Sequence, residues 1–174
     1  MATRNDDEPI LASPLHAPMI NRSRTTGTVR KIRELLRQQL YGVLCSQGEN
    51  QAYGSVVAFA ASGDFRSLFF STPVYTRKYR LVSRSPSVAF VVDNRCHFPD
   101  DMAKVEAVTA TGRAREVRLP AVRRKIAGLL AHRHPQLKSF VAAESCAIFE
   151  IKVFRYFHVT RFQEVGQWLP PRAG

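Results

Sequence analysis

The most informative part of the chain is Leu-Phe-Phe-Ser-Thr-Pro-Val-Tyr-Thr-Arg-Lys-Tyr-Arg, residues 68–80. The apolar run 68–70 is typical of a buried strand, and the Ser-Thr-Pro that follows ends it. Thr76 is suited to cap a short helix that stops before Pro86. The segment therefore predicts a strand, a turn and a helix in quick succession.

The start of this short helix carries two cations. Arg77 and Lys78 fall in its first turn, where the helix dipole disfavours positive charge. An anion bound there, such as a phosphate group, would make both cations and the free N–H groups favourable. A solvated basic turn is the alternative, because surface charges are screened and cost little.

Length and composition favour a single folded domain. The chain has 174 residues, of which 45% are hydrophobic, enough for a core of its own. No apolar stretch approaches the roughly 20 residues that span a bilayer, and the N-terminus lacks the apolar segment of a secretory signal. We therefore expect a cytoplasmic protein with no membrane partner. The 3 cysteines are too scattered for a disulfide framework or a zinc site, and Cys45 and Cys146 are expected to be buried thiols.

The net charge of +12 attracts phosphate-bearing partners, such as nucleotides, nucleic acids and anionic lipids. The basic residues are spread over every segment, whereas a nucleic-acid surface more often shows a stripe of cations with exposed aromatic residues. Scattered solubilising charge is the interpretation we favour. A basic RNA- or DNA-binding barrel, in which Arg77 and Lys78 meet backbone phosphates, stays open as an alternative.

Hydrophobic periodicity predicts a mainly β domain, residues 26–174, behind a flexible N-terminal arm, residues 1–25. Strands are predicted at 41–45, 53–60, 67–72, 88–93, 105–117 and 145–162, and helices at 29–40, 76–84 and 120–132. Six or more antiparallel strands with about three helices indicate a small β-barrel with helical decorations, not a doubly wound sheet.

The same patterns predict which side chains face the core. The strand at 88–93 is expected to be buried on both faces. In the first helix Arg30, Arg33 and Arg37 are expected to face water. The residues expected to face inward are Val29, Ile32, Leu36 and Leu40 in the first helix, Val108, Ala110, Gly112 and Ala114 in the strand 105–117, and Val122, Ile126, Leu129 and Leu130 in the last helix.

The order of these elements and several short motifs resemble the pyridoxamine 5′-phosphate oxidase-like family of FMN-binding split barrels. The resemblance covers residues 28–162 and is most specific in Phe70-Ser71-Thr72…Thr76-Arg77-Lys78, in Ser85-Pro86-Ser87-Val88-Ala89 and in Gly112-Arg113-Ala114. It implies a Greek-key split barrel. It also implies a homodimer that holds FMN in a cleft between the two subunits.

Carried over by position, the resemblance assigns the cofactor-binding residues. Arg77 and Lys78 would grip the FMN phosphate, which suits a guanidinium fork beside a point charge, and Thr76 would add a hydroxyl. Ser71 and Thr72 would contact the ribityl chain or the ring edge. The strand residues Tyr53, Gly54, Ser55 and Val56 would lie beside the isoalloxazine, where Gly54 permits a flat ring to approach the backbone. Trp168 would reach the flavin of a neighbouring subunit.

The C-terminus departs from the true pyridoxamine phosphate oxidases, because the later Arg-Leu-x-Pro run of their signature is absent and the spacing around Trp168 differs. The vitamin B6 reaction is therefore not expected. We expect an FMN-dependent oxidoreductase acting on an unknown small molecule. The helix 29–40 followed by Tyr41-Gly42-Val43-Leu44 also resembles the heme-utilisation and deazaflavin-using branches. A heme protein in which His158 or His97 ligates iron, and a non-enzymatic flavin carrier or sensor, stay open.

Other chemistry finds little support in the sequence. His132 and His134 lie two residues apart, so they project to different sides of a helix end and are not expected to bind a metal. Neither Gly-x-Ser-x-Gly nor a Gly-rich dinucleotide fingerprint is present. No catalytic residue can be assigned, and redox chemistry would belong to the bound flavin.

Overall fold

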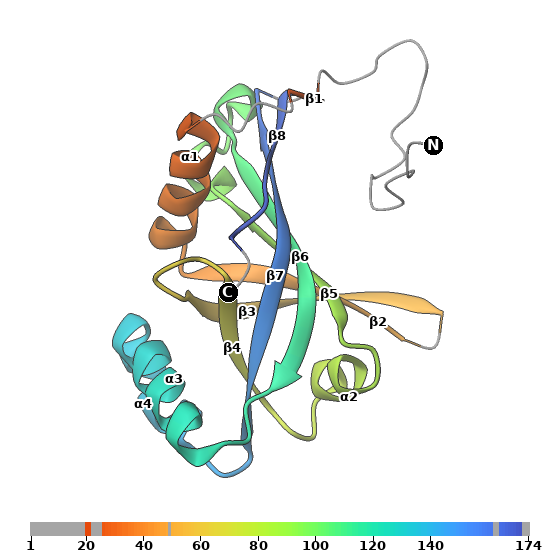
Figure 1. Cartoon of the computed structure of the whole chain (residues 1–174), viewed down its shortest axis with the longest axis vertical. Helices are drawn as coiled ribbons and strands as arrows, with labels where there is room; N and C mark the ends of the chain where they lie inside the picture. The colour runs from red at the N-terminus through yellow and green to blue at the C-terminus, as the bar shows by residue number, and fades with distance from the viewer. Residues whose placement is uncertain (1–19, 22–25, 49, 162–163, 172–174) are drawn as a thin grey trace.

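The fold is built on an antiparallel barrel, seen in a computed structural model that describes residues 20–21, 26–48, 50–161 and 164–171 (Figure 1). The strands are β1 (Ile20–Asn21), β2 (Tyr41–Gly48), β3 (Gln51–Ala61), β4 (Ser67–Pro73), β5 (Ser87–Asp93), β6 (Ala107–Glu116), β7 (Cys146–Thr160) and β8 (Glu164–Trp168). Strands β2 to β7 follow the order β7-β4-β3-β2-β5-β6, and a pairing of β6 with β7 closes the ring. The predicted mainly β split barrel is confirmed.

Strand β7 spans the whole barrel and joins its two parts. Its first half pairs with β4 and its second half with β8, while β6 lies along its other edge. Strand β1, in parallel with β8, comes from the segment predicted as an N-terminal arm, of which only residues 20–21 are described. Arg161 turns the chain from β7 into β8 with a φ of 47°. Strand β8 was not predicted as a separate element.

Helices cover both ends of the barrel and one of its outer faces. They are α1 (Thr26–Gln38), α2 (Arg77–Arg84), α3 (Pro120–Arg133) and α4 (Lys138–Ala142), with 3₁₀ turns η1 (Arg95–His97), η2 (Met102–Lys104) and η3 (Pro135–Leu137). In Figure 1, α1 lies at the upper left of the barrel and α2 at the lower right, while α3 and α4 lie beside β4. The outer face of β2, β5 and β6 carries no described helix.

The main core fills the barrel with side chains that alternate along its strands. Phe70 stacks on Phe149 with 5.3 Å between ring centroids, and Tyr156 donates a hydrogen bond of 2.8 Å to the carbonyl of Phe65. The predicted inward face of β6 is confirmed, since Val108, Ala110, Gly112 and Ala114 are all buried. A second, smaller core lies outside the barrel, where α3 and α4 cover β3, β4 and β7; it contains Ala60, Phe69, Ile126, Leu130, Val141 and Ile148.

Gly112 is required by a bulge between β6 and β7. The register shifts between Thr111, which pairs with Arg155, and Gly112, which pairs with Val153, so Phe154 has no partner on β6. A Cβ at Gly112 would overlap the carbonyl oxygen of Lys152. Only glycine lets the two strands approach this closely at the bulge.

Two predictions for α1 are wrong. Leu40 is 42% exposed instead of buried, because the helix ends at Gln38 and Leu35 takes the inward position. Arg33 does not face water, since its guanidinium lies 5.1 Å above the ring of Trp168. Arg133 helps to end the helix, because it donates hydrogen bonds to the carbonyls of Leu36, Arg37 and Gln39.

Other predicted positions also differ. In α3 only Ile126 and Leu130 are buried, while Val122 and Leu129 are 43% and 37% exposed, because the helix packs on the barrel along a narrow stripe. The outward residues of β5, Ala89 and Val91, are only partly covered in the single chain. Cys146 is buried as predicted, whereas Cys45 is only partly buried. Helix α4 was not predicted.

Candidate functional site

Strands β3 and β4 separate after a short ladder. They pair with each other only where Phe59–Ala61 of β3 meets residues 68–70 of β4. Before this ladder, residues 51–58 of β3 pair with β2 alone. After it, residues 71–73 of β4 pair with β7 alone. In Figure 1, β3 runs toward the hairpin at the right, while β4 descends to the turn before α2. The first part of β3, residues 51–58, therefore has one edge without a strand partner.

Backbone groups of β3 point to this open edge. The N–H of Phe59 donates to the carbonyl of Leu40 on the β2 side, whereas the N–H of Ser62 donates to the carbonyl of Ser67 on the β4 side. Since these directions alternate along a strand, even-numbered residues of β3 face the side that β4 has left. The N–H and C=O groups at the open edge belong to Gly54, Val56 and Ala58.

The start of α2 is fixed by a network of threonine hydroxyls. The Thr76 hydroxyl accepts a hydrogen bond of 3.3 Å from the N–H of Tyr79 and donates one of 2.9 Å to the carbonyl of Pro73, which confirms it as the helix cap. It also lies 2.8 Å from the Thr72 hydroxyl, which must be the donor of that pair. Thr72 is 1% exposed. The hydroxyl groups of Thr72 and Thr76 thus form hydrogen bonds that stabilise the turn before α2.

Arg77 connects the start of α2 to the first residues of β3. Its guanidinium donates a hydrogen bond of 2.9 Å to Gln51 Oε1 and lies 5.1 Å from the ring centre of Tyr53. The structure thus brings together two predicted site residues that are far apart in the sequence. Gln51 was missed, because it lies just before the predicted strand.

Lys78 lies on a different face of α2 from Arg77. One turn along, Leu81 and Val82 share its face and are buried, and Lys78 itself is partly buried. Desolvation lowers the pKa of its ammonium group, and none of the described residues forms an ion pair with it. A bound anion would offset the cost of burying this cation.

Further arginines flank the helix start. A hollow of about 190 Å³ is lined by Arg77, Arg80, Leu81 and Arg84. Positions 77, 80 and 84 have helical spacing, so they share one face of α2. This spacing is visible in the sequence, although of these three arginines only Arg77 was predicted to bind the cofactor.

The predicted residues of β3 divide between its two faces. Tyr53 and Ser55 point toward α2 and the barrel, and the Ser55 hydroxyl is buried without a hydrogen-bond partner among the described residues. Gly54 and Val56 point outward, and Val56 is 67% exposed. A Cβ at Gly54 would meet only Val43 Cγ1, at 3.5 Å, so the packing of the chain itself leaves room there for a larger residue.

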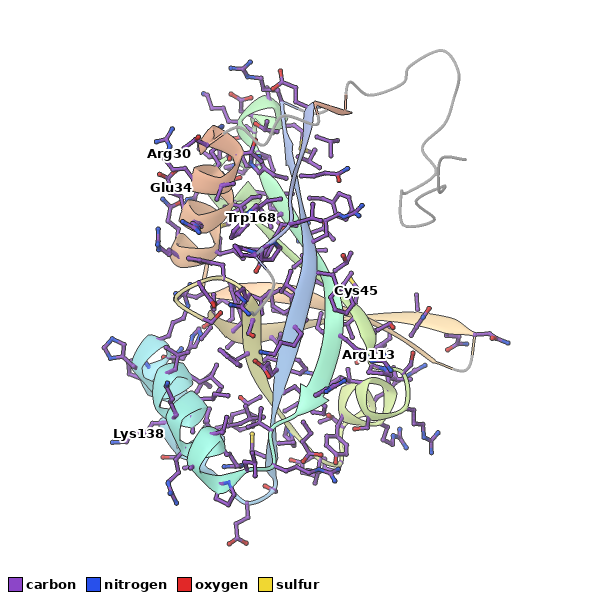
Figure 2. The ribbon with its side chains drawn as sticks, in the orientation of Figure 1. Arg30, Glu34, Cys45, Arg113, Lys138 and Trp168 are labelled. Atoms are coloured by element: carbon purple, nitrogen blue, oxygen red, sulfur yellow. The ribbon has the colours of Figure 1, made fainter. Side chains whose placement is uncertain are left out.

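Ser71 and Trp168 have different surroundings. Ser71 is partly exposed beside Cys146; burial raises the pKa of this thiol, and a hydrogen bond with Ser71 partly offsets the effect. Trp168 is 8% exposed and stacks on Tyr156, with 5.3 Å between ring centroids. Figure 2 shows it beside α1, away from Arg113 and Cys45 near α2. Within one chain, Trp168 belongs to the core and not to the cluster at the start of α2.

The histidines considered as iron ligands are otherwise engaged or exposed. His158 is buried, and its Nε2 lies 2.9 Å from a carboxylate oxygen of Glu106, which also binds Lys31 at 2.7 Å. His97 lies exposed on η1. No group of potential metal ligands is found in the part of the chain that the structure describes, and that part contains no helix long and apolar enough to cross a membrane.

Solved structures share this fold at low sequence identity. A heme binding protein from Mycobacterium smegmatis aligns with a TM-score of 0.70 at 13% identity, over 79% of this chain and 56% of its own. HutZ, a heme storage protein from Vibrio cholerae, aligns with a TM-score of 0.63 at 12% identity, over 71% and 88%. A FAD-binding protein from Mesorhizobium loti aligns with a TM-score of 0.60 at 16% identity, over 75% and 90%. These likenesses establish the fold alone, and the chain spans little more than half of the first protein.

Sequence comparison is more specific. Among curated proteins, none matches the chain by sequence. The profile of the family described as pyridoxamine 5′-phosphate oxidase, however, matches residues 28–159, which include β2 to β6, all of β7 but its last residue, and α2. The chain therefore belongs to the pyridoxamine 5′-phosphate oxidase family.

Proposed function

We propose that the protein binds FMN at the open edge of β3 and the start of α2. The observation that carries this proposal is the row of unpaired backbone groups at Gly54, Val56 and Ala58, with Arg77 in contact with the neighbouring residues Gln51 and Tyr53. Lys78 follows Arg77 directly in the first turn of α2. The polar edge of an isoalloxazine needs hydrogen-bond donors and acceptors, and its phosphate needs cations.

The residues present fit this cofactor. Lys78 is a partly buried cation without an anion, and the Ser55 hydroxyl is buried without a partner among the described residues. At Gly54 the chain leaves space above the backbone. Arg77 and Lys78 would hold the phosphate, with Tyr53, Ser55, Val56 and Ser71 around the remainder, while Thr72 and Thr76 keep α2 in position.

Bound FMN supplies two-electron redox chemistry, so an oxidoreductase acting on a small molecule is the activity that we infer. The chain contributes the binding, the orientation and the electrostatics of the site. Heme is the second cofactor found among proteins of this fold. It is less well supported here, because His158 already binds Glu106 through Nε2 and His97 lies exposed on η1.

We also propose a homodimer, formed through the uncovered outer face of the barrel. Register places Val56, Val43, Val91, Thr109 and Phe157 in one row across neighbouring strands. Such a row on an open sheet face is typical of a surface that another chain covers. Because Val56 belongs to both the row and the cofactor site, a second copy packed here would border the flavin.

The spectrum of the purified protein tests the cofactor. Absorbance bands at about 370 and 450 nm indicate flavin, whereas a strong band at about 400 nm indicates heme. The double variant Arg77→Ala/Lys78→Ala should weaken FMN binding by about 3–6 kcal/mol, since charge-assisted hydrogen bonds contribute roughly 1.5–3 kcal/mol each. Arg124→Ala/Lys125→Ala, which removes two exposed cations from α3, is the matched control and should bind FMN normally.

Two results would contradict the proposal. One is a heme spectrum with no affinity for added FMN, and the other is unchanged FMN affinity in Arg77→Ala/Lys78→Ala. Sedimentation of the loaded protein tests the dimer, and Val56→Asp should shift it toward the monomer, because a charge in the row, even at its β3 end, would be buried unpaired when a second copy covers it.

A further inference from the structure

Gln51, the first residue of β3, contacts one of the two cations assigned to the FMN phosphate. Its side-chain oxygen accepts a hydrogen bond of 2.9 Å from Arg77 Nη2. Tyr53 lies two residues along β3 and so shares a face with Gln51, and its ring centre lies 5.1 Å from the guanidinium carbon of Arg77. Two neighbouring side chains of β3 therefore hold the same guanidinium group.

The hairpin of β2 and β3, which carries Gln51, packs against α2. Gly48, at the end of β2, lies so close to the helix that an added Cβ would come within 2.6 Å of Leu81 Cδ2. Leu81 is buried and lies one turn after Arg77. This contact anchors the hairpin beside the first turns of α2, so Gln51 reaches Arg77 from a defined position.

Arg77 keeps most of its hydrogen-bonding capacity for a ligand. A guanidinium has five N–H groups, and the bond to Gln51 uses one of them. No carboxylate among the described residues forms an ion pair with Arg77, so its positive charge is not offset. Gln51 is a neutral acceptor, which orients the guanidinium and leaves its charge available, whereas a carboxylate at this position would neutralise it.

We propose that Gln51 is a positioning residue that sets the preference of the site for a phosphorylated flavin. It acts through Arg77, because it holds the guanidinium in place before the phosphate arrives and so reduces the side-chain entropy that binding costs. The inference rests on the proposed function, since the anion concerned is the FMN phosphate. It deepens that function by assigning the selection of the phosphate to a neutral side chain as well as to the cations.

Quenching of flavin fluorescence gives the dissociation constants of FMN and riboflavin, and their ratio is the phosphate preference. Gln51→Glu should reduce this preference by about five- to tenfold, because the new carboxylate pairs with Arg77 and repels the phosphate. Gln51→Leu, which removes only the acceptor, should reduce it by about two- to threefold, because Arg77 is then ordered only on binding. Riboflavin lacks the phosphate, so its affinity should stay unchanged in both variants.

Gln47→Glu is the matched control. Gln47 is exposed and pairs with Ala52, so it lies on the same hairpin as Gln51 but on the opposite face. The same charge placed there should change the preference by less than about twofold, since exposed charges are screened. In the background of Arg77→Ala, Gln51→Leu should have no further effect, because the two residues act as one unit.

Three results would overturn the inference and leave the FMN proposal standing: an unchanged phosphate preference in Gln51→Glu, an equal loss in Gln47→Glu, and equal weakening of FMN and riboflavin in the Gln51 variants. The last result would indicate a structural role of Gln51 in the hairpin. Equal affinity of the natural sequence for FMN and riboflavin is a separate outcome, because it would show that the phosphate is not bound and would overturn both proposals.

Discussion

Two glycines of the barrel, Gly54 and Gly112, differ in whether the packing of the chain itself requires glycine. At Gly54 an added Cβ meets only Val43 Cγ1, at 3.5 Å, which is an ordinary contact. At Gly112 an added Cβ overlaps the carbonyl oxygen of Lys152 and lies 2.9 Å from Ile151 Cγ2. Alanine at these positions should therefore have opposite effects on the free protein.

The expected magnitudes follow from these contacts. Gly54→Ala removes backbone freedom from the unfolded chain without strain, so it should stabilise the cofactor-free protein by about 0.4–1 kcal/mol. It also places a methyl group where the flavin is proposed to approach, and should weaken FMN binding by about 1–3 kcal/mol, the usual cost of overpacking. Gly112→Ala forces β6 and β7 apart at the bulge and should lower stability by about 1–3 kcal/mol.

Urea and thermal unfolding of the cofactor-free proteins measure the stability of each variant, and quenching of FMN fluorescence measures affinity. The melting temperature should rise slightly for Gly54→Ala and fall by about 2–12 °C for Gly112→Ala. FMN affinity of folded Gly112→Ala should stay close to that of the natural sequence. Full FMN affinity in a stably folded Gly54→Ala would refute the reasoning about the β3 edge.

Three further predictions concern single side chains. Trp168→Ala should lower the free energy of unfolding, measured in urea, by about 3–5 kcal/mol, because the stack on Tyr156 is lost. The folded fraction should keep its FMN affinity. Loss of FMN binding without loss of stability would instead show that Trp168 contacts the cofactor. Burial alone would raise the pKa of Glu106, but hydrogen bonds from Lys31 and His158 lower it. The stability that it contributes is therefore present above its unfolded pKa of about 4.3 and is lost as pH falls through the folded value, so unfolding curves of Glu106→Gln should depend less on pH in this acid range. Burial lowers the pKa of Lys78, and a bound dianion favours the charged form of its ammonium group. FMN affinity should therefore fall as pH rises through that pKa. Titrations above about pH 8, where the phosphate is fully ionised, measure this fall, and Lys78→Gln should not show it.

Local patterns in the sequence were enough to predict the barrel and α2. Alternation along β6 identified its inward residues, and the capping residue Thr76 located the helix start correctly. These signals act between residues that are near in sequence, so periodicity and capping preference report them. Tyr53, selected from the resemblance, and Arg77, selected from its position at the helix start, do meet in space.

Features that depend on distant contacts could not be predicted in this way. Val122 and Leu129 have helical spacing, yet the packing of α3 on the barrel leaves them exposed, and Leu40 is exposed because α1 ends before it, at Gln38. The open edge of β3 exists because β4 diverges after Phe70, and no residue of β3 encodes that divergence. The ring of Trp168 lies in the core because Tyr156 and Arg33, both far away in sequence, enclose it.

The most direct test of the flavin site compares FMN with riboflavin, which lacks the phosphate, in the natural sequence and in Arg77→Ala/Lys78→Ala. The natural sequence should bind FMN at least about a hundredfold more tightly than riboflavin, and the double variant should bind the two equally, because two charge-assisted contacts to the phosphate are lost. Equal affinity for FMN and riboflavin in the natural sequence, or the same loss for both ligands in the variant, would contradict the assignment of the phosphate to the start of α2.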